Sequence, residues 1–154
     1  MVMDKVDRAI LSELQGNARI TNAELAEKVS LSPTPCLRRV RRLEDQGMIR
    51  GYLTRLDLDQ VGLAISALVF VQLTLNSTAN AELFEKSIRG IERIQGCFVM
   101  AGRFDYVLRV VARDLRDYEK LIKGELADIP NVKTIESTII LSEVEIDHRL
   151  PIPS

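Results

Sequence analysis

The start of the chain places apolar side chains at helical spacing between polar ones. Val6, Ile10 and Leu14 lie four residues apart, so they share one face of a predicted first helix. Thr21 and Glu24 have the spacing of a capping box, in which each side chain bonds the backbone amide of the other. Two short helices are therefore expected before the first proline.

A third helix is expected directly after them. Ser32 can cap it, and Pro33 suits its first turn because the missing amide hydrogen costs nothing there. The helix is predicted to run to Gln46, and Gly47 can adopt the left-handed conformation that ends a helix. Three short helices with a tight turn between the second and third are typical of a helix-turn-helix, whose last helix enters the major groove of DNA.

The apolar spacing changes from helical to alternating after Gly62. The alternating positions are Ile65, Ala67, Val69, Val71, Leu73 and Leu75. On a strand these side chains point to one face, which is expected to be core. The opposite face carries Leu68 and Phe70, which would form an exposed apolar patch unless a partner subunit covers them.

The rest of the chain predicts a helix, two strands joined by a turn, a second helix and a last strand. Their expected ranges are 79–89, 95–101, 106–112, 114–127 and 133–145, with the turn at 102–105. Together with the strand after Gly62 they give the order β-α-β-β-α-β. That order predicts an antiparallel, ferredoxin-like sheet with two helices on one face, so the fold class is α+β. Its open face again favours a dimer.

A short polar stretch separates the helical part from the alternating part. We therefore predict an N-terminal domain at 1–56, a linker at 57–62, a second domain at 63–148 and a tail at 149–154.

Composition agrees with a folded protein that carries no cofactor. Hydrophobic residues make up 46% and charged residues 28% of the chain, and the formal net charge is −1. The sequence shows neither a membrane-spanning run nor a secretory signal at its start, so a cytoplasmic location is expected. With one histidine (His148) and two cysteines (Cys36, Cys97), both expected to be inert buried thiols, neither a metal site nor a catalytic set is expected.

Four arginines fall within five residues of the expected third helix, at positions 38, 39, 41 and 42. At ~100° per residue, the apolar stripe of this helix consists of Cys36, Leu37, Val40 and Leu43. The opposite, outward side carries Thr34, Pro35, Arg38 and Arg42, with Arg39 and Arg41 at its flanks. This arrangement fits base edges at the centre and phosphates at the sides. The alternative is a solvated face, partly paired with Glu44 and Asp45.

Residues 49–55 alternate weakly in hydrophobicity. They can form a short wing that lays Arg50 and Arg55 along the DNA backbone. A plain extended connector is an equally good interpretation.

Five stretches of the sequence resemble the Lrp/AsnC transcriptional regulators, the leucine- and asparagine-responsive "feast/famine" proteins of bacteria and archaea. They are DRAIL at 7–11, NARITNAEL at 17–25, LSPTPCLRRVRRLE at 31–44, QGMI at 46–49 and AGRFDY at 101–106. The motifs match in order and spacing over essentially the whole chain, and the leucine-responsive branch is the nearest.

The resemblance implies an N-terminal winged helix-turn-helix that binds double-stranded DNA and a C-terminal ferredoxin-like βαββαβ domain that binds an amino-acid effector. It also implies a homodimer that assembles into an octamer or a similar particle, with effector sites between dimers. The candidate DNA-binding residues are Ser32, Thr34, Pro35, Arg38, Arg39, Arg41, Arg42 and Arg50. The candidate effector residues are Val99, Gly102, Asp105, Tyr106, Leu115, Thr138, Ile139 and Ile140.

In this effector set, Asp105 can receive a ligand ammonium group and the turn amides can hold a carboxylate. The alternative at this position is an ordinary hairpin turn. For the protein as a whole, two alternatives to an effector-controlled regulator are an architectural, nucleoid-type DNA binder whose second domain only oligomerises, and a small-molecule enzyme or ligand-binding module. The arginines and the missing catalytic set argue against the last.

Overall fold

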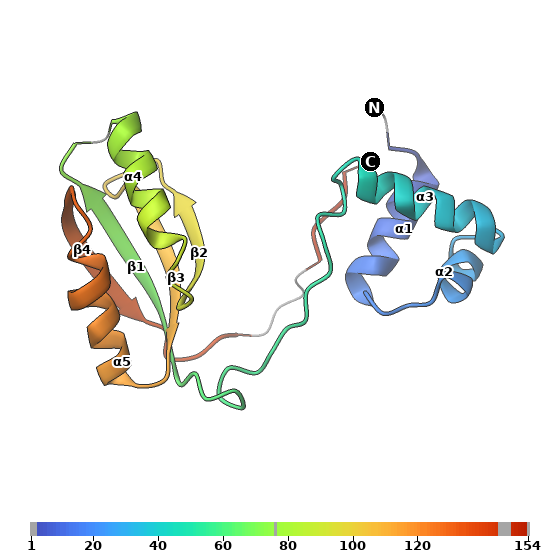
Figure 1. Ribbon diagram of the computed structural model, residues 1–154. Helices are drawn as coiled ribbons and strands as arrows, with labels where there is room; N and C mark the ends of the chain where they lie inside the picture. Colours follow the sequence, from blue (N-terminus) through green and yellow to red (C-terminus); the bar gives the residue numbers. More distant parts are fainter. Residues whose placement is uncertain (1–2, 76, 145–148, 154) are drawn as a thin grey trace. The chain divides into compact units, whose positions relative to one another are not determined.

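The computed structural model describes residues 3–75, 77–144 and 149–153, and these form two compact units (Figure 1). The N-terminal unit comprises Met1–Arg55 together with Glu145–Ser154, and the C-terminal unit comprises Leu56–Val144. The described end of the chain, which we expected as a separate tail, thus lies with the N-terminal unit. His148 and the end of the expected last strand lie outside the described residues.

The N-terminal unit contains three helices, α1 (Lys5–Gly16), α2 (Asn22–Lys28) and α3 (Pro33–Asp45). The expected capping box of Thr21 and Glu24 is present, and Asp4 forms a second one at the start of α1. Ser32 occupies the N-cap position of α3, but its side chain makes no capping hydrogen bond. The core that the helices enclose consists of Ile10, Leu25, Ala26, Val29, Cys36 and Leu43.

The chain turns sharply after α3 and continues as an extended connector. Gly47 has φ +71°, and the amides of Met48 and Ile49 both donate to the carbonyl of Leu43, at 3.0 and 3.2 Å. No strand occurs among residues 3–55, so the wing interpretation of residues 49–55 is not what the structure shows. The Tyr52 hydroxyl donates to Glu44 Oε1 at 2.8 Å, which holds the connector to the end of α3.

The C-terminal unit has the expected β-α-β-β-α-β order. Its elements are β1 (Ile65–Leu73), α4 (Thr78–Ile88), β2 (Ile94–Val99), β3 (Tyr106–Ala112), α5 (Leu115–Lys120) with the π-helix Leu121–Leu126, and β4 (Val132–Ile139). The strands lie in the order β2-β3-β1-β4, and every pair is antiparallel. The ferredoxin-like prediction is therefore confirmed. The last strand ends at Ile139, earlier than predicted, and the second helix continues into a π-helix after Lys120.

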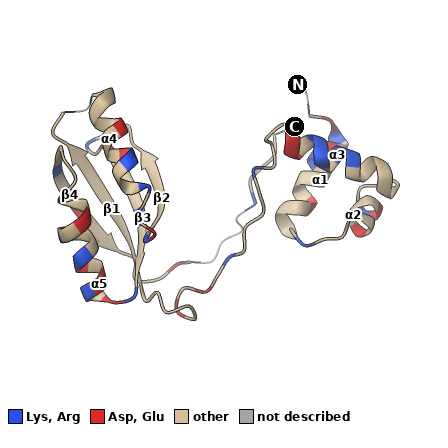
Figure 2. Ribbon diagram, viewed as in Figure 1, with Lys and Arg blue, Asp and Glu red and all other residues tan. Residues whose placement is uncertain are grey.

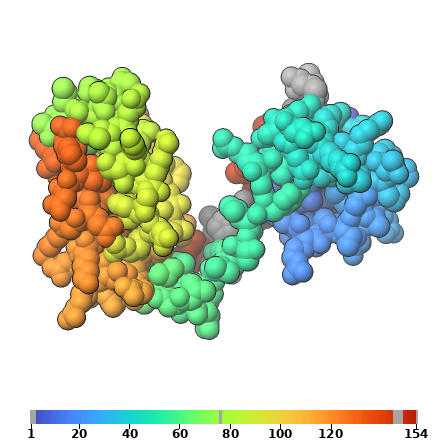
Figure 3. Space-filling model, in the orientation of Figure 1, coloured from blue at the N-terminus to red at the C-terminus, as the bar shows by residue number. Residues whose placement is uncertain are grey.

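One face of the sheet forms the core of the C-terminal unit beneath α4 and α5. The yellow-green and orange side chains of these two helices lie in front of the sheet in Figure 3. The fully buried members of this core include Val69, Leu108, Phe84 and Leu121. The alternation that predicted this face holds from Ala67 to Leu73, whereas Leu75 lies beyond the strand and is exposed.

Among the described residues of this unit, no helix packs on the opposite face of the sheet. Phe70 of β1 and Phe98 of β2 both align with Val107 of β3, so they share that face. The Phe98 side chain is 59% exposed, and Phe70 stacks on Phe104 with the ring centroids 5.5 Å apart. Leu68 and Phe70, which we expected to form an exposed apolar patch, are half-buried, and the exposed apolar surface on this face comes from Phe98.

The end of the chain contacts α1 in the N-terminal unit. The Leu150 amide donates to Gln15 Oε1 at 2.6 Å, and Gln15 Nε2 donates back to the Leu150 carbonyl at 3.3 Å. Arg8 Nε donates to the carbonyl of Pro153 at 2.9 Å. The last described residues thus form a strap along one side of α1.

Candidate functional site

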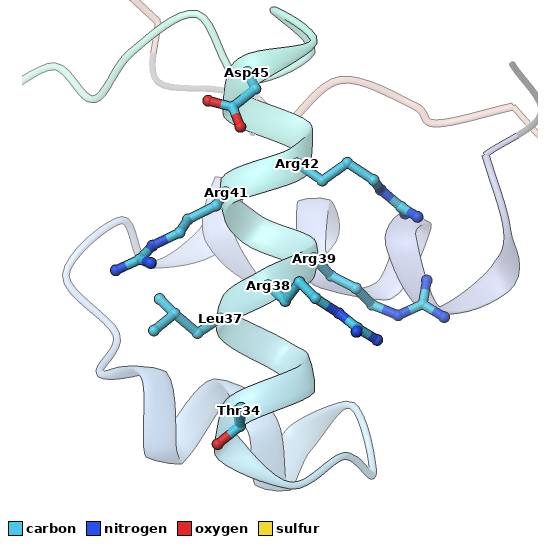
Figure 4. Close-up of a pocket in the computed structure, with 7 residues that line it drawn as sticks. All are labelled: Thr34, Leu37, Arg38, Arg39, Arg41, Arg42 and Asp45. Carbon is cyan, nitrogen blue, oxygen red and sulfur yellow. The ribbon is translucent and has the colours of Figure 1, made fainter.

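The outward surface of α3 carries the arginine cluster, seen as the blue stretch of that helix in Figure 2. A shallow groove on this surface is lined by Thr34, Leu37, Arg38, Arg39, Arg41, Arg42 and Asp45. Figure 4 shows these side chains diverging: Leu37 and Arg41 project to one side of the helix, and Arg39 and Arg42 to the other. The four arginines are therefore not equivalent.

Arg39 and Arg42 are engaged with the start of α1. Arg42 Nη2 lies 2.6 Å from both carboxylate oxygens of Asp7, and Arg39 Nη1 donates to Asp7 Oδ1 at 2.8 Å and to Asp4 Oδ2 at 2.6 Å. The Asp7 side chain is only 3% exposed, so its charge is compensated by these two guanidinium groups. We expected Arg42 at the centre of the outward face; its guanidinium instead turns toward α1.

The Asp4 carboxyl is the exposed partner in this cluster. The backbone amide of Asp7 and the Arg39 guanidinium hold its pKa below the ordinary value. The carboxylates of Asp4 and Asp7 in turn raise the pKa of Arg39. Arg39 thus stays a cation that anchors α3 to α1.

Arg38 and Arg41 are exposed and have no hydrogen-bond or ion-pair partner in the described part of the chain. Glu44, one of the acidic residues considered as their partners, instead accepts from Tyr52. Because no described residue of their unit holds them, both guanidinium forks are available to bind bases or phosphates.

Leu37 corrects the predicted apolar stripe. Leu37 is 38% exposed and is not part of the core of the N-terminal unit, whereas Cys36 and Leu43 are fully buried in that core. The buried side of α3 is thus narrower than predicted, and Leu37 belongs to the outward groove.

The remaining candidate DNA-binding residues lie at the two ends of α3. Thr34 is exposed and Pro35 half-buried in its first turn, next to the exposed Ser32. Arg50 is exposed on the connector after the helix. Thr34, Arg38 and Arg41 thus line the outward groove, and Arg39 and Arg42 line it while their guanidinium groups turn toward α1. Ser32, Pro35 and Arg50 lie outside the groove, toward the two ends of the helix.

The candidate effector residues fall into two groups at opposite ends of the sheet. Val99, Gly102, Asp105 and Tyr106 lie at the β2–β3 hairpin, whereas Leu115, Thr138, Ile139 and Ile140 lie near the start of β1. Tyr106 is paired with Val71 and Ile139 with Ala67, so four residues of β1, roughly 13 Å, separate the two groups along the strand. A single copy of the C-terminal unit does not bring them together.

Asp105 fixes the hairpin to β1. Its Oδ2 accepts the Leu73 amide at 2.8 Å, its own amide donates to the Val71 carbonyl at 3.0 Å, and its carbonyl accepts the Met100 amide at 2.8 Å. The structure therefore gives Asp105 the turn-forming role that we considered as the alternative. Its contact with a ligand ammonium group stays a prediction.

Tyr106 lies beneath α4, on the core side of the hairpin. Its ring packs against Phe84 with centroids 4.7 Å apart, and its hydroxyl donates to Glu85 Oε1 at 3.1 Å. Burial and the neighbouring Glu85 carboxylate raise the pKa of Tyr106 to about 12. A cleft beside it, between α4 and β2, is lined by Glu85, Ile88, Arg89, Ile94, Gln95, Gly96, Cys97, Val99 and Tyr106.

The two cysteines differ in exposure. Cys36 is buried as expected, whereas Cys97 is exposed, because β2 is an edge strand that α4 does not fully cover. Burial raises the pKa of both thiols, and Glu85 raises that of Cys97 further. Among the described residues we find neither a cluster of metal-ligating side chains nor a helix able to span a membrane.

Sequence reasoning missed the part that Asp7 and Asp4 play in the site. The arginine partners of Asp7 lie more than thirty positions away along the chain. Acidic residues on one helix and arginines on another do not indicate in the sequence that their side chains will form ion pairs.

Two family models match this chain. "Winged helix-turn-helix DNA-binding" matches residues 3–50, and "Lrp/AsnC ligand binding domain" matches residues 66–150. The leucine-responsive regulatory proteins of Escherichia coli K12 and of Klebsiella pneumoniae are each 43% identical to it over 152 residues, 97% of this chain and 92% of theirs.

Solved structures give the same result. A transcriptional regulator of Neisseria meningitidis, solved as a complex with L-Met, superimposes with a TM-score of 0.90 at 35% identity, covering 97% of both chains. An AsnC family transcriptional regulator of Agrobacterium tumefaciens gives a TM-score of 0.88 at 31% identity, again covering 97% of both. These relatives are regulators rather than enzymes.

Proposed function

The chain belongs to the Lrp/AsnC family of transcriptional regulators, with a DNA-binding and an amino-acid-binding domain, and from this premise we propose how its residues divide the work. Residues 1–56 bind the operator, and residues 63–148 bind the effector and assemble the particle. The compartment is the cytoplasm, where its DNA partner lies. The free guanidinium groups of Arg38 and Arg41 on the outward surface of α3 carry this proposal.

Arg38 and Arg41 contact base edges in the major groove, because an arginine fork can bond guanine O6 and N7 together. Thr34, Pro35 and the Ser32 hydroxyl, which makes no cap bond, lie at the end of α3 where a helix N-terminus approaches phosphate. Arg50 contacts the backbone from the connector. Arg39 and Arg42 hold the helix at its angle through Asp7 and lend positive charge to the surface.

A two-fold dimer presents two copies of α3 to the DNA. The operator is then an imperfect palindrome whose half-sites are spaced by about 10 bp or a multiple of it. The open face of the sheet, with Phe70 and the exposed Phe98, supplies the dimer contact, and dimers stack into an octamer or a similar particle.

The effector is a free amino acid bound between copies of the chain. The two groups of candidate residues lie at opposite ends of one sheet, so a single pocket that uses both needs the hairpin of one copy and the β4 end of another. A ligand held in this way changes the free energy of assembly, and through assembly the affinity for DNA. Because the Neisseria relative was solved with L-Met, methionine and leucine are the first amino acids to test.

Fluorescence anisotropy of the protein on a labelled copy of its own upstream DNA tests this proposal. The titration is run over a range of salt, with and without a mixture of the twenty amino acids. We expect tight binding that weakens steeply as the salt concentration rises. We also expect the amino-acid mixture to change the affinity for DNA. Binding without any shift favours the architectural alternative, and no salt-dependent binding at all rejects the proposal.

A further inference from the structure

Leu37 stands out on the surface proposed to meet DNA. It is an apolar side chain on a helix face otherwise made of arginines, a threonine and Asp45, and it remains 38% exposed. Thr34 precedes it by three residues and Arg41 follows it by four, so the three side chains form one row along the helix. Figure 4 shows Leu37 and Arg41 projecting to the same side of α3.

The position of Leu37 is not explained by the packing of its own unit. Its neighbours Cys36 and Leu43 are fully buried, and Val40 packs against the same core, but Leu37 is absent from that cluster. A lone exposed leucine needs no explanation on an ordinary surface. Here it lies between two groups that bind DNA, where the binding partner must bury it.

The major groove offers one apolar group to such a side chain, the C5-methyl group of thymine. Contact between the methyl group and the leucine side chain removes apolar surface of both from water, and this burial makes the binding free energy more favourable. The guanidinium of Arg41 beside it favours an adjacent guanine. A short row of an apolar and a cationic side chain therefore matches a step in which thymine neighbours guanine.

We propose that Leu37 determines part of the operator sequence by contacting the methyl group of a thymine next to the base that Arg41 contacts. The inference rests on the proposed function, since it needs α3 in the major groove. It adds a base preference that hydrogen bonding does not supply.

Replacing thymine by uracil removes this one methyl group and leaves every hydrogen-bonding group of the base in place. A high-affinity operator is selected from a random-sequence pool, and each dT in turn is replaced by dU. Kd is measured by anisotropy for the wild type and for Leu37→Ala. For the wild type, we expect the replacement of one thymine in each half-site to raise Kd about fourfold. This ratio corresponds to about 0.8 kcal/mol for one buried methyl group.

The Leu37→Ala variant is expected to bind the unmodified operator more weakly and to lose its sensitivity to dU at that thymine. Leu53→Ala is the matched control, because Leu53 is 96% exposed on the connector outside the groove, and this variant should keep the full sensitivity. Circular dichroism spectra of the variants report whether each has folded like the wild type.

A wild type that tolerates dU at every position, or a Leu37→Ala variant that keeps the dU effect at the same thymine, overturns the inference while DNA binding itself stands. Absence of binding to the unmodified operator by the wild type rejects the proposed function instead, and the inference falls with it. The two failures are thus distinguished by the first titration of the series.

Discussion

The carboxylate of Asp7 accepts both of its shortest hydrogen bonds from one nitrogen of Arg42, with the Nη2 atom 2.6 Å from Oδ1 and from Oδ2. Asp7 belongs to α1 and Arg42 to the recognition helix, so this pair fixes the angle between them. Arg39 adds a third bond to the same carboxylate. The positive surface that we propose to face DNA is thus built around a buried negative charge.

Asp7→Asn should destabilise the N-terminal unit by about 2–3 kcal/mol, because it leaves two guanidinium groups without their shared anion. Urea unfolding followed by circular dichroism measures the loss. Glu13→Gln is the control on the same helix as Asp7; it breaks an exposed ion pair with Lys28 of α2 and should cost under about 1 kcal/mol. Equal losses for the two variants would contradict the buried role of Asp7.

Arg38→Ala and Arg42→Ala should separate base recognition from support of the helix. Arg38 has no partner among the described residues of its unit, so its removal should relax base preference by roughly 1–3 kcal/mol at one position without lowering stability. Arg42→Ala should lower the stability of the N-terminal unit and weaken binding to all operator sequences by the same factor. Binding to a library of single-base operator variants tests this, and relaxed preference in Arg42→Ala alone would reverse the assignment.

Deletion of residues 149–154 should lower the stability of the N-terminal unit by about 1–2 kcal/mol, because Gln15 and Arg8 lose their backbone partners on the strap. Differential scanning calorimetry gives the shift in Tm. Gln15→Ala in the full chain should reproduce part of that shift. An unchanged Tm in the truncated protein would show that the strap does not stabilise α1.

The C-terminal unit should lose stability at alkaline pH through Tyr106. Burial and Glu85 raise the pKa of Tyr106 to about 12, against about 10 for an unfolded tyrosine. The neutral phenol therefore stabilises the fold fully below pH 10, and this contribution falls as the pH rises through 12. Unfolding free energies of the wild type should decline more steeply between pH 10 and 12 than those of Tyr106→Phe. Parallel slopes would rule out Tyr106 as the titrating group.

Phe98→Glu should lower the oligomeric state, because it places a charge on the exposed apolar face proposed to form the dimer. Sedimentation velocity should show a smaller particle than the wild type at the same concentration. Leu75→Glu alters an exposed leucine beyond the end of β1 and serves as the control that should leave the mass unchanged. If the Phe98→Glu variant keeps the mass of the wild type, this face of the sheet does not form the dimer contact.

The sequence by itself determined the elements and their order. Helix caps such as Thr21 with Glu24 act over three residues, the left-handed Gly47 ends α3 locally, and the alternation from Ala67 to Leu73 marks one face of a strand, so each signal lies within one element. The arginine cluster likewise lies within one element, so the sequence alone predicts α3 as the recognition helix. These interactions are short in sequence, and pattern alone reveals them.

Only the tertiary structure decided which of these side chains are free. Asp7 captures Arg39 and Arg42 from another helix, Leu37 stays outside the core although it neighbours the stripe, and Cys97 is exposed because β2 is an edge strand. The two ends of the sheet likewise separate effector residues that the family resemblance places together. Ion pairing and burial depend on residues that folding brings together from distant parts of the chain, so local sequence patterns do not predict them.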